Sequence, residues 1–168
     1  MIYKKHICNS LSDLNKRYDF SLTLSDSKDS IYFSKLALLE YCGWIEESFD
    51  LIILRSIKNK LQQKKFKDII NAAIKKNSGF QYESNFRPML ITAIGVNEVE
   101  KLEKKIDANG SIQVLISELH ALKEDRNSAA HGWIRGTTRL YPAPSILISR
   151  LNKVHPIIKS IYSYTTML

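Results

Sequence analysis

The sequence has few residues of the two types that most often interrupt helices. It contains six glycines and four prolines in 168 residues. It also has no useful stretch in which apolar and polar residues alternate, the pattern of a half-buried strand. These absences argue against a fold of many short strands joined by tight turns, and they favour long helices.

Cysteine is also scarce. Cys8 and Cys42 are far apart and belong to no paired spacing. Neither a disulfide framework nor a zinc site is therefore predicted, and we expect no metal and no cofactor. Cys42 lies in an apolar run, where a free cysteine usually serves as a small core residue.

Segments that would direct the chain to a membrane are not evident. The stretch MIYKKHICNSLSD lacks the apolar region of a signal peptide. The most apolar stretch, LALLEYCGWIEESFDLIIL, is interrupted by four acidic residues and does not fit a membrane span. With 44% hydrophobic and 25% charged residues, the composition is that of a globular protein. We expect one cytoplasmic domain over residues 1–168, with no membrane partner.

The charge is positive overall and unevenly distributed. The formal net charge is +8 and the pI about 9.4, which predicts a polyanionic partner. Residues 55–76 hold eight basic residues and one acid, whereas residues 126–168 hold six basic residues and no acid. The lysine-rich stretch KNKLQQKKFK also fits a solvated helix face. The acid-free C-terminal quarter is the more informative of the two.

The pattern of apolar residues predicts an all-α helical bundle of five to six helices with one long central helix. We expect helices over residues 10–18, 30–61, 64–76 and 145–164, the last kinked at Pro156. Between them, Pro88 is expected to open a short helix and Asn109–Gly110 to close another, with a further helix starting at Ser111. Gly79 is a plausible left-handed terminator for the third.

Two of these helices have predicted buried faces. The long helix is apolar around most of its girth, as expected in the middle of a bundle. The residues expected to face inward on it are Ile31, Leu36, Leu39, Trp44, Phe49, Ile52, Ile53 and Ile57. On the basic helix the inward residues are Phe66, Ile69, Ile70, Ala73 and Ile74.

The stretch EDRNSAAHGW places arginine, asparagine and histidine within six residues. On one continuous helix from Ile112, Arg126 falls inside an apolar stripe, while Asn127 and His131 align with His120 at its edge. A buried guanidinium needs a partner. Arg126 and His131 point well apart on a regular helix, so the helix distorts or they meet through a long side chain or a second subunit. The stripe consists of Ile112, Leu115, Ile116, Leu119, Leu122, Ala130 and Trp133.

This motif resembles the signature of the HEPN superfamily, an arginine followed after four to six residues by a histidine. The stretch RNSAAH has four intervening residues, the favoured asparagine directly after Arg126, and the common Ala-His-Gly ending. An all-α domain of this length, with a long central helix and the motif on a late helix, is also similar to that superfamily. Outside the motif the resemblance is one of architecture.

The resemblance implies a metal-independent endoribonuclease that acts as a homodimer. His131 would be the general acid or base, because an imidazole exchanges a proton near neutral pH. Arg126 would hold the scissile phosphate and Asn127 would orient the histidine or a phosphate oxygen. Arg135, Arg139 and Tyr141 would contact the RNA. Such enzymes occur in toxin–antitoxin and defence systems, often with a cognate antitoxin.

Two alternative functions remain open. The chain could be a non-catalytic HEPN-like module that dimerises or binds a partner, or one that binds RNA without cutting it. In the first case Arg126 would belong to a buried ion pair with Glu40, Glu47 or Glu118. His131 would then be a helix-terminal residue near the last carbonyl groups.

Overall fold

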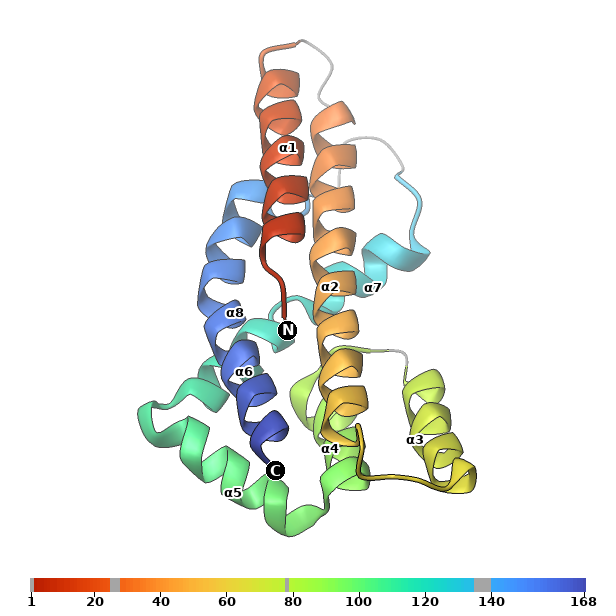
Figure 1. Cartoon of the computed structure of the whole chain (residues 1–168). Coiled ribbons are helices and arrows are strands. Elements are labelled where there is room, and N and C mark those ends of the chain that lie inside the picture. The colour runs from red at the N-terminus through yellow and green to blue at the C-terminus, as the bar shows by residue number, and fades with distance from the viewer. Residues whose placement is uncertain (1, 25–27, 78, 135–139) are drawn as a thin grey trace. The chain divides into compact units, whose positions relative to one another are not determined.

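The computed structural model describes residues 2–24, 28–77, 79–134 and 140–168, and these form helices, turns and loops with no strand. The prediction of an all-α fold is therefore confirmed. The helices appear in Figure 1 as α1 (Lys5–Leu22), α2 (Lys28–Ser56), α3 (Lys64–Lys76), α4 (Arg87–Ile94), α5 (Val96–Ile106), α6 (Ser111–His120), α7 (Lys123–His131) and α8 (Pro144–Met167). A π-helical turn, η1 (Tyr82–Phe86), precedes α4, and a 3-10 turn, η2 (Asp107–Asn109), follows α5.

The described residues form more helices than the five to six predicted. The helix expected to run from Ser111 through the motif is interrupted after His120, which divides it into α6 and α7. Gly95 separates α4 from α5 with a φ of 86°, a conformation that favours glycine. The first interruption adds one helix to the prediction, whereas separate helices were already expected on the two sides of Gly95.

Helix boundaries were predicted well where sequence signals were strong. The predicted bounds of α3 are confirmed, as are Pro88 in the first turn of α4 and Gly110 as a left-handed terminator with a φ of 70°. The long helix α2 ends at Ser56 instead of residue 61, because the chain turns there and Asn59 has a φ of 67°. The first helix extends beyond the predicted residues 10–18 at both ends.

The described residues pack into two compact units. The motif unit consists of Tyr3–Trp44 and Ala121–His155, and the second unit consists of Ile2, Ile45–His120 and Pro156–Leu168. Helices α2 and α8 each contribute their first part to the motif unit and their remainder to the second unit.

The motif unit is built from α1, α7 and the first parts of α2 and α8. Figure 1 shows α1 antiparallel to the neighbouring part of α2. The indole N–H of Trp44 donates to the Tyr3 carbonyl at 3.2 Å, and the Lys4 ammonium donates to Asn152 at 2.5 Å. Leu36 was predicted to face inward but is 45% exposed. The buried apolar residues include Ile7, Leu11, Ile31, Leu38, Tyr41, Cys42, Leu122, Ala129, Leu147, Leu151 and Val154.

The second unit has an aromatic core with a charged group at its edge. The rings of Phe49 and Phe86 stack with centroids 4.1 Å apart, and Tyr82 lies 5.7 Å from Phe86. The Tyr82 hydroxyl donates to the Glu103 carboxylate at 2.9 Å, and Arg87 Nε donates to the same oxygen at 2.7 Å. Burial, and then the Glu103 carboxylate, raise the pKa of Tyr82 far above its usual value. This network satisfies the polar end of a buried aromatic side chain.

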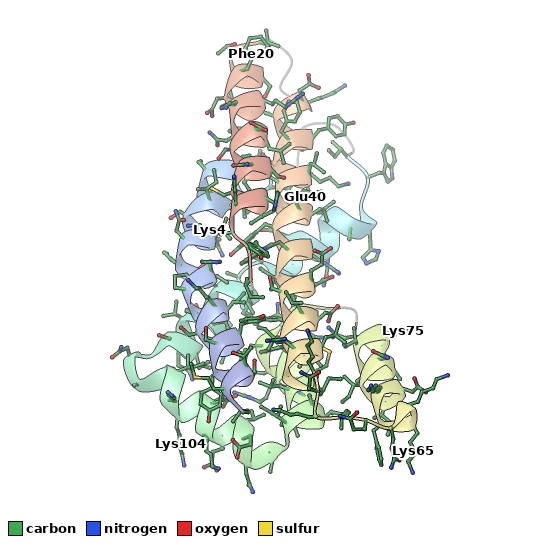
Figure 2. The ribbon with its side chains drawn as sticks, in the orientation of Figure 1. Lys4, Phe20, Glu40, Lys65, Lys75 and Lys104 are labelled. Carbon is green, nitrogen blue, oxygen red and sulfur yellow. The ribbon has the colours of Figure 1, made fainter. Side chains whose placement is uncertain are left out.

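Helix α3 buries less of its apolar face than predicted. Ile70 is 4% exposed, but Phe66 and Ile69 are 45% and 55% exposed, so their predicted inward position is wrong. The helix ends at Asn77, whose backbone is extended, and not through a left-handed residue. Gly79 has a different role, because a β-carbon there would lie 2.9 Å from Asn85 Oδ1. Figure 2 shows Lys65 and Lys75 on this helix, both exposed.

Asp50 on α2 is expected to destabilise the folded protein at neutral pH. Burial, and then the nearby carboxylates of Glu46 and Glu47, raise the pKa of Asp50. We expect Asp50→Asn to raise the Tm by about 1–2 °C at pH 7. The difference should vanish near pH 3, because the folded protein takes up the proton at Asp50 as the pH falls through the raised pKa. Asp13→Asn, at an exposed position of α1, is the control, and a lower Tm for Asp50→Asn at pH 7 would contradict the expectation.

Candidate functional site

The motif lies on α7, whose sequence suits its place in the motif unit. Glu124 and Asp125 occupy the first turn and His131 the last, so both ends complement the helix dipole. Ala129 is 2% exposed and belongs to the buried core, whereas Ala130 is exposed. The prediction placed Ala130 in the buried stripe, but the buried alanine is Ala129.

The three motif residues differ in their exposure. Asn127 and His131 are exposed, and Arg126 is half-buried. The Arg126 guanidinium Nη1 donates to Asn127 Oδ1 at 3.4 Å, a long hydrogen bond. Asn127 and His131 are one turn apart and therefore lie on the same face of α7. A polar, solvent-facing pair with an arginine beside it is a suitable contact for a phosphate group.

Arg126 and His131 leave α7 in different directions. They are five residues apart on a helix that runs without interruption from Lys123 to His131, which places them about 140° apart around its axis. The proposed distortion of the helix between them is therefore absent. His120 ends α6, before the interruption, and does not share a helix with Asn127 and His131 as the predicted column required.

Gly132 ends α7 with a conformation in which a side chain has no room. Its backbone is extended, and its N–H donates to the Ser128 carbonyl at 2.8 Å. A β-carbon at this position would lie 2.6 Å from the Ser128 oxygen. Glycine is therefore required directly after His131 by close approach of the backbone and not by a positive φ.

Lys35 on α2 is a residue of this site that the sequence did not reveal. Its ammonium group donates to the Gly132 carbonyl at 2.7 Å, which fixes the chain just after His131 and places a positive charge there. Lysine is favourable beside the carbonyl groups at a helix C-terminus. The two residues are separated by most of the chain, and the pattern of α2 contains no signal for this contact.

Trp133 also differs from its predicted position. It was assigned to the buried stripe but is 72% exposed, because α7 ends at His131 and the chain turns away. A large exposed aromatic ring two residues from His131 is able to stack on a base. The signal that could have identified it is Gly132, which ends the helical register before the tryptophan.

The predicted RNA-contacting residues lie after the motif. Arg135 and Arg139 are outside the described residues. Tyr141 is half-buried and lies shortly before α8. Its predicted contact with RNA remains a prediction.

A test of the glycine that follows the motif uses two substitutions in the same unit. Gly132→Ala should lower the free energy of unfolding by about 1–3 kcal/mol, because the new methyl group overlaps the Ser128 carbonyl. Gly43→Ala, inside α2, has no atom within 4 Å of the new β-carbon and should stabilise the protein by about 0.5–1 kcal/mol. Thermal unfolding measures both. Equal stability of the two variants would show that the chain after His131 adapts freely.

The described residues show no group of three or more His, Cys, Asp or Glu side chains arranged to hold a metal ion. Within residues 2–24, 28–77, 79–134 and 140–168, none of the helices combines the length and the apolar character that crossing a bilayer requires.

The candidate site consists of Arg126, Asn127 and His131, together with Lys35 and Trp133. Comparisons of the chain with protein-family models, with curated proteins and with solved structures find no match.

Proposed function

We propose that this protein is a metal-independent endoribonuclease that acts as a homodimer. The observation that carries the proposal is the arrangement on α7, where Asn127 and His131 share an exposed face and Arg126 lies beside them. A general acid or base and a guanidinium suit the cleavage of RNA at a 2′-hydroxyl, and an amide can orient either group. The likeness of RNSAAH to the HEPN signature supports the same reaction.

The reaction begins with proton removal from a ribose 2′-hydroxyl by His131. The 2′-oxygen attacks the adjacent phosphorus, a new P–O2′ bond forms, and the bond from phosphorus to the 5′-oxygen breaks. The leaving 5′-oxygen takes up a proton from water, and His131 returns its own proton to the solvent, so the products are a 2′,3′-cyclic phosphate and a 5′-hydroxyl. Arg126 stabilises the negative charge that grows on the phosphate oxygens, and Asn127 orients the imidazole or a phosphate oxygen.

A dimer is part of the proposal because of the angle between Arg126 and His131. With about 140° between them, the two side chains leave one copy of α7 in different directions. A two-fold axis near α7 would place His131 opposite the partner subunit's Arg126, with one phosphodiester between them. Two equivalent sites would then lie in the same interface.

Contacts with the rest of the RNA would come from residues near the motif. Trp133 and Tyr141 would stack on bases, and Arg135, Arg139 and Lys35 would contact phosphates. From Arg126 onward the chain has no carboxylate to repel the RNA backbone. The cellular context we propose is a cytoplasmic toxin–antitoxin or defence system, in which a cognate antitoxin would neutralise the enzyme.

Incubation of the purified protein with transfer, messenger and ribosomal RNA in the presence of EDTA tests this function. We expect fragments that end in 2′,3′-cyclic phosphate. Intact RNA with and without EDTA, or fragments with a 3′-hydroxyl, would contradict the proposal. Intact RNA recovered together with salt-dependent binding would identify an RNA-binding module without cleavage.

The burial of Arg126 favours a second candidate, a non-catalytic module that dimerises or binds a partner. A half-buried guanidinium bonded to its neighbour Asn127 also suits a purely structural role. Under this alternative, replacing Arg126 destabilises the fold while replacing the exposed His131 has no measurable effect. Melting temperatures of the two variants, measured beside RNA cleavage, separate the two candidates.

A further inference from the structure

The second unit contains a cavity that no residue of the motif helix lines. Its volume is about 650 Å³, within the range of sites that bind small organic molecules. The end of α5, η2 and the start of α6 form one side, and residues 156–167 of α8 form the other. All of these segments belong to the second unit, so the cavity is complete within it.

The charge of the cavity is positive. Lys105 and Lys159 line it, and no carboxylate does. Lys101 and Lys104, the other lysines of α5, form ion pairs at 2.8 and 2.7 Å with glutamates of the same helix. In the part of the chain that the structure describes, no ion pair joins Lys105 or Lys159 to a carboxylate. Two cations without a protein counter-ion in one cavity favour an anionic ligand.

The position of Lys105 is supported by a neighbouring ring. Its ammonium nitrogen lies 5.3 Å from the centre of the Tyr164 ring, a cation–π distance. The nearby carboxylate of Asp107 caps α6, because it accepts the Ile112 N–H at 2.9 Å, and it lines a different cavity. The ring therefore holds Lys105 at the cavity without neutralising its charge.

Hydroxyl groups add further donors. Ser111 and Ser163 line the cavity. A phosphate monoester has up to two negative charges and three strong acceptor oxygens. Two lysines and two hydroxyl groups match that chemistry better than they match a single carboxylate.

The remaining wall of the cavity is apolar. Ile106, Pro156, Ile157 and Met167 contribute to it, together with the face of the Tyr164 ring. Inorganic phosphate would leave this surface uncovered, whereas an attached organic group would bury it. We propose that this cavity binds a small phosphate monoester whose organic part is aromatic or aliphatic. The site includes no residue of α7 and does not depend on the proposed ribonuclease activity.

Calorimetric titration of the full chain with 2-naphthyl phosphate tests the proposal. We expect one saturable site per chain. Inorganic phosphate and 2-naphthol should both bind more weakly, because the first lacks the organic group and the second lacks the phosphate. Equal affinity for 2-naphthol would indicate an apolar site without phosphate recognition. Absence of saturable binding of the ester would overturn the proposal.

Three lysine variants locate the binding. Lys105→Met and Lys159→Met should each weaken the binding of 2-naphthyl phosphate about tenfold, the loss of one charge-assisted hydrogen bond. Lys104→Met is the matched control. Lys104 lies on the same helix as Lys105, but it pairs with Glu100 and does not line the cavity. The affinity of this control variant for 2-naphthyl phosphate should stay within about twofold of that of the unsubstituted protein. Equal losses in all three variants would show that only the general positive charge attracts the ester.

Discussion

Replacing His131 with alanine is expected to reduce RNA cleavage by a factor of about 10²–10⁴, the usual contribution of a general acid or base. The melting temperature should change little, because the His131 side chain is exposed at the end of α7. Cleavage rates on one defined RNA, measured in EDTA, give the first quantity and thermal unfolding gives the second. This combination distinguishes a group that performs chemistry from one that holds the helix.

The matched control is His120→Ala. His120 is also an exposed histidine at the end of a helix, but it belongs to α6 and not to the motif. Its replacement should leave the cleavage rate unchanged. Cleavage by His131→Ala at the original rate would remove His131 from the mechanism, and any ribonuclease activity would then have to be assigned to other residues.

The all-α architecture was predictable because it depends on local signals that act over a few residues. Pro88 and Gly110 mark a helix start and a helix end, and the structure places both as the sequence indicated. The period of apolar residues fixed the bounds of α3. It could not show which part of that stripe would be covered, and Phe66 remains 45% exposed.

The motif helix shows where this reasoning fails. The apolar spacing of residues 112–133 fits one continuous helix, yet the structure breaks it after His120. Periodicity reports the direction of side chains only while the helix continues. The break moved Ala130 out of the predicted stripe and removed His120 from the predicted column, and the end of α7 at His131 left Trp133 outside the stripe.

The residues of the candidate site could be named from the sequence only in part. The three motif residues were proposed from their types, their order and their likeness to the HEPN signature, and their catalytic role stays a prediction. Lys35 could not be found in this way, because its contact with the Gly132 carbonyl depends on how α2 and α7 pack. Tertiary contacts between residues so far apart leave no periodic signal in one sequence.

A dimer that combines two different variants, Arg126→Gln and His131→Ala, provides the most discriminating test of the proposed site. Arg126→Gln removes the guanidinium fork while keeping a polar side chain, and it should lower cleavage by about 10²–10³ in the homodimer. If each site combines Arg126 of one subunit with His131 of the other, mixing this variant with His131→Ala restores one intact site per heterodimer. Random exchange of subunits would then recover about a quarter of the original activity, since half of the dimers are mixed and each has one of two sites.

The same mixture excludes the competing arrangements. A site built within one subunit would show no recovery, because every subunit in the mixture then lacks one of the two groups. If Arg126 has only a structural role, Arg126→Gln should lower the melting temperature, and the cleavage rate should fall no more than the amount of folded protein does. The angle of about 140° between the two residues on α7 makes recovery the expected result, because a second subunit can bring a guanidinium opposite His131 where the two side chains of one helix start in different directions.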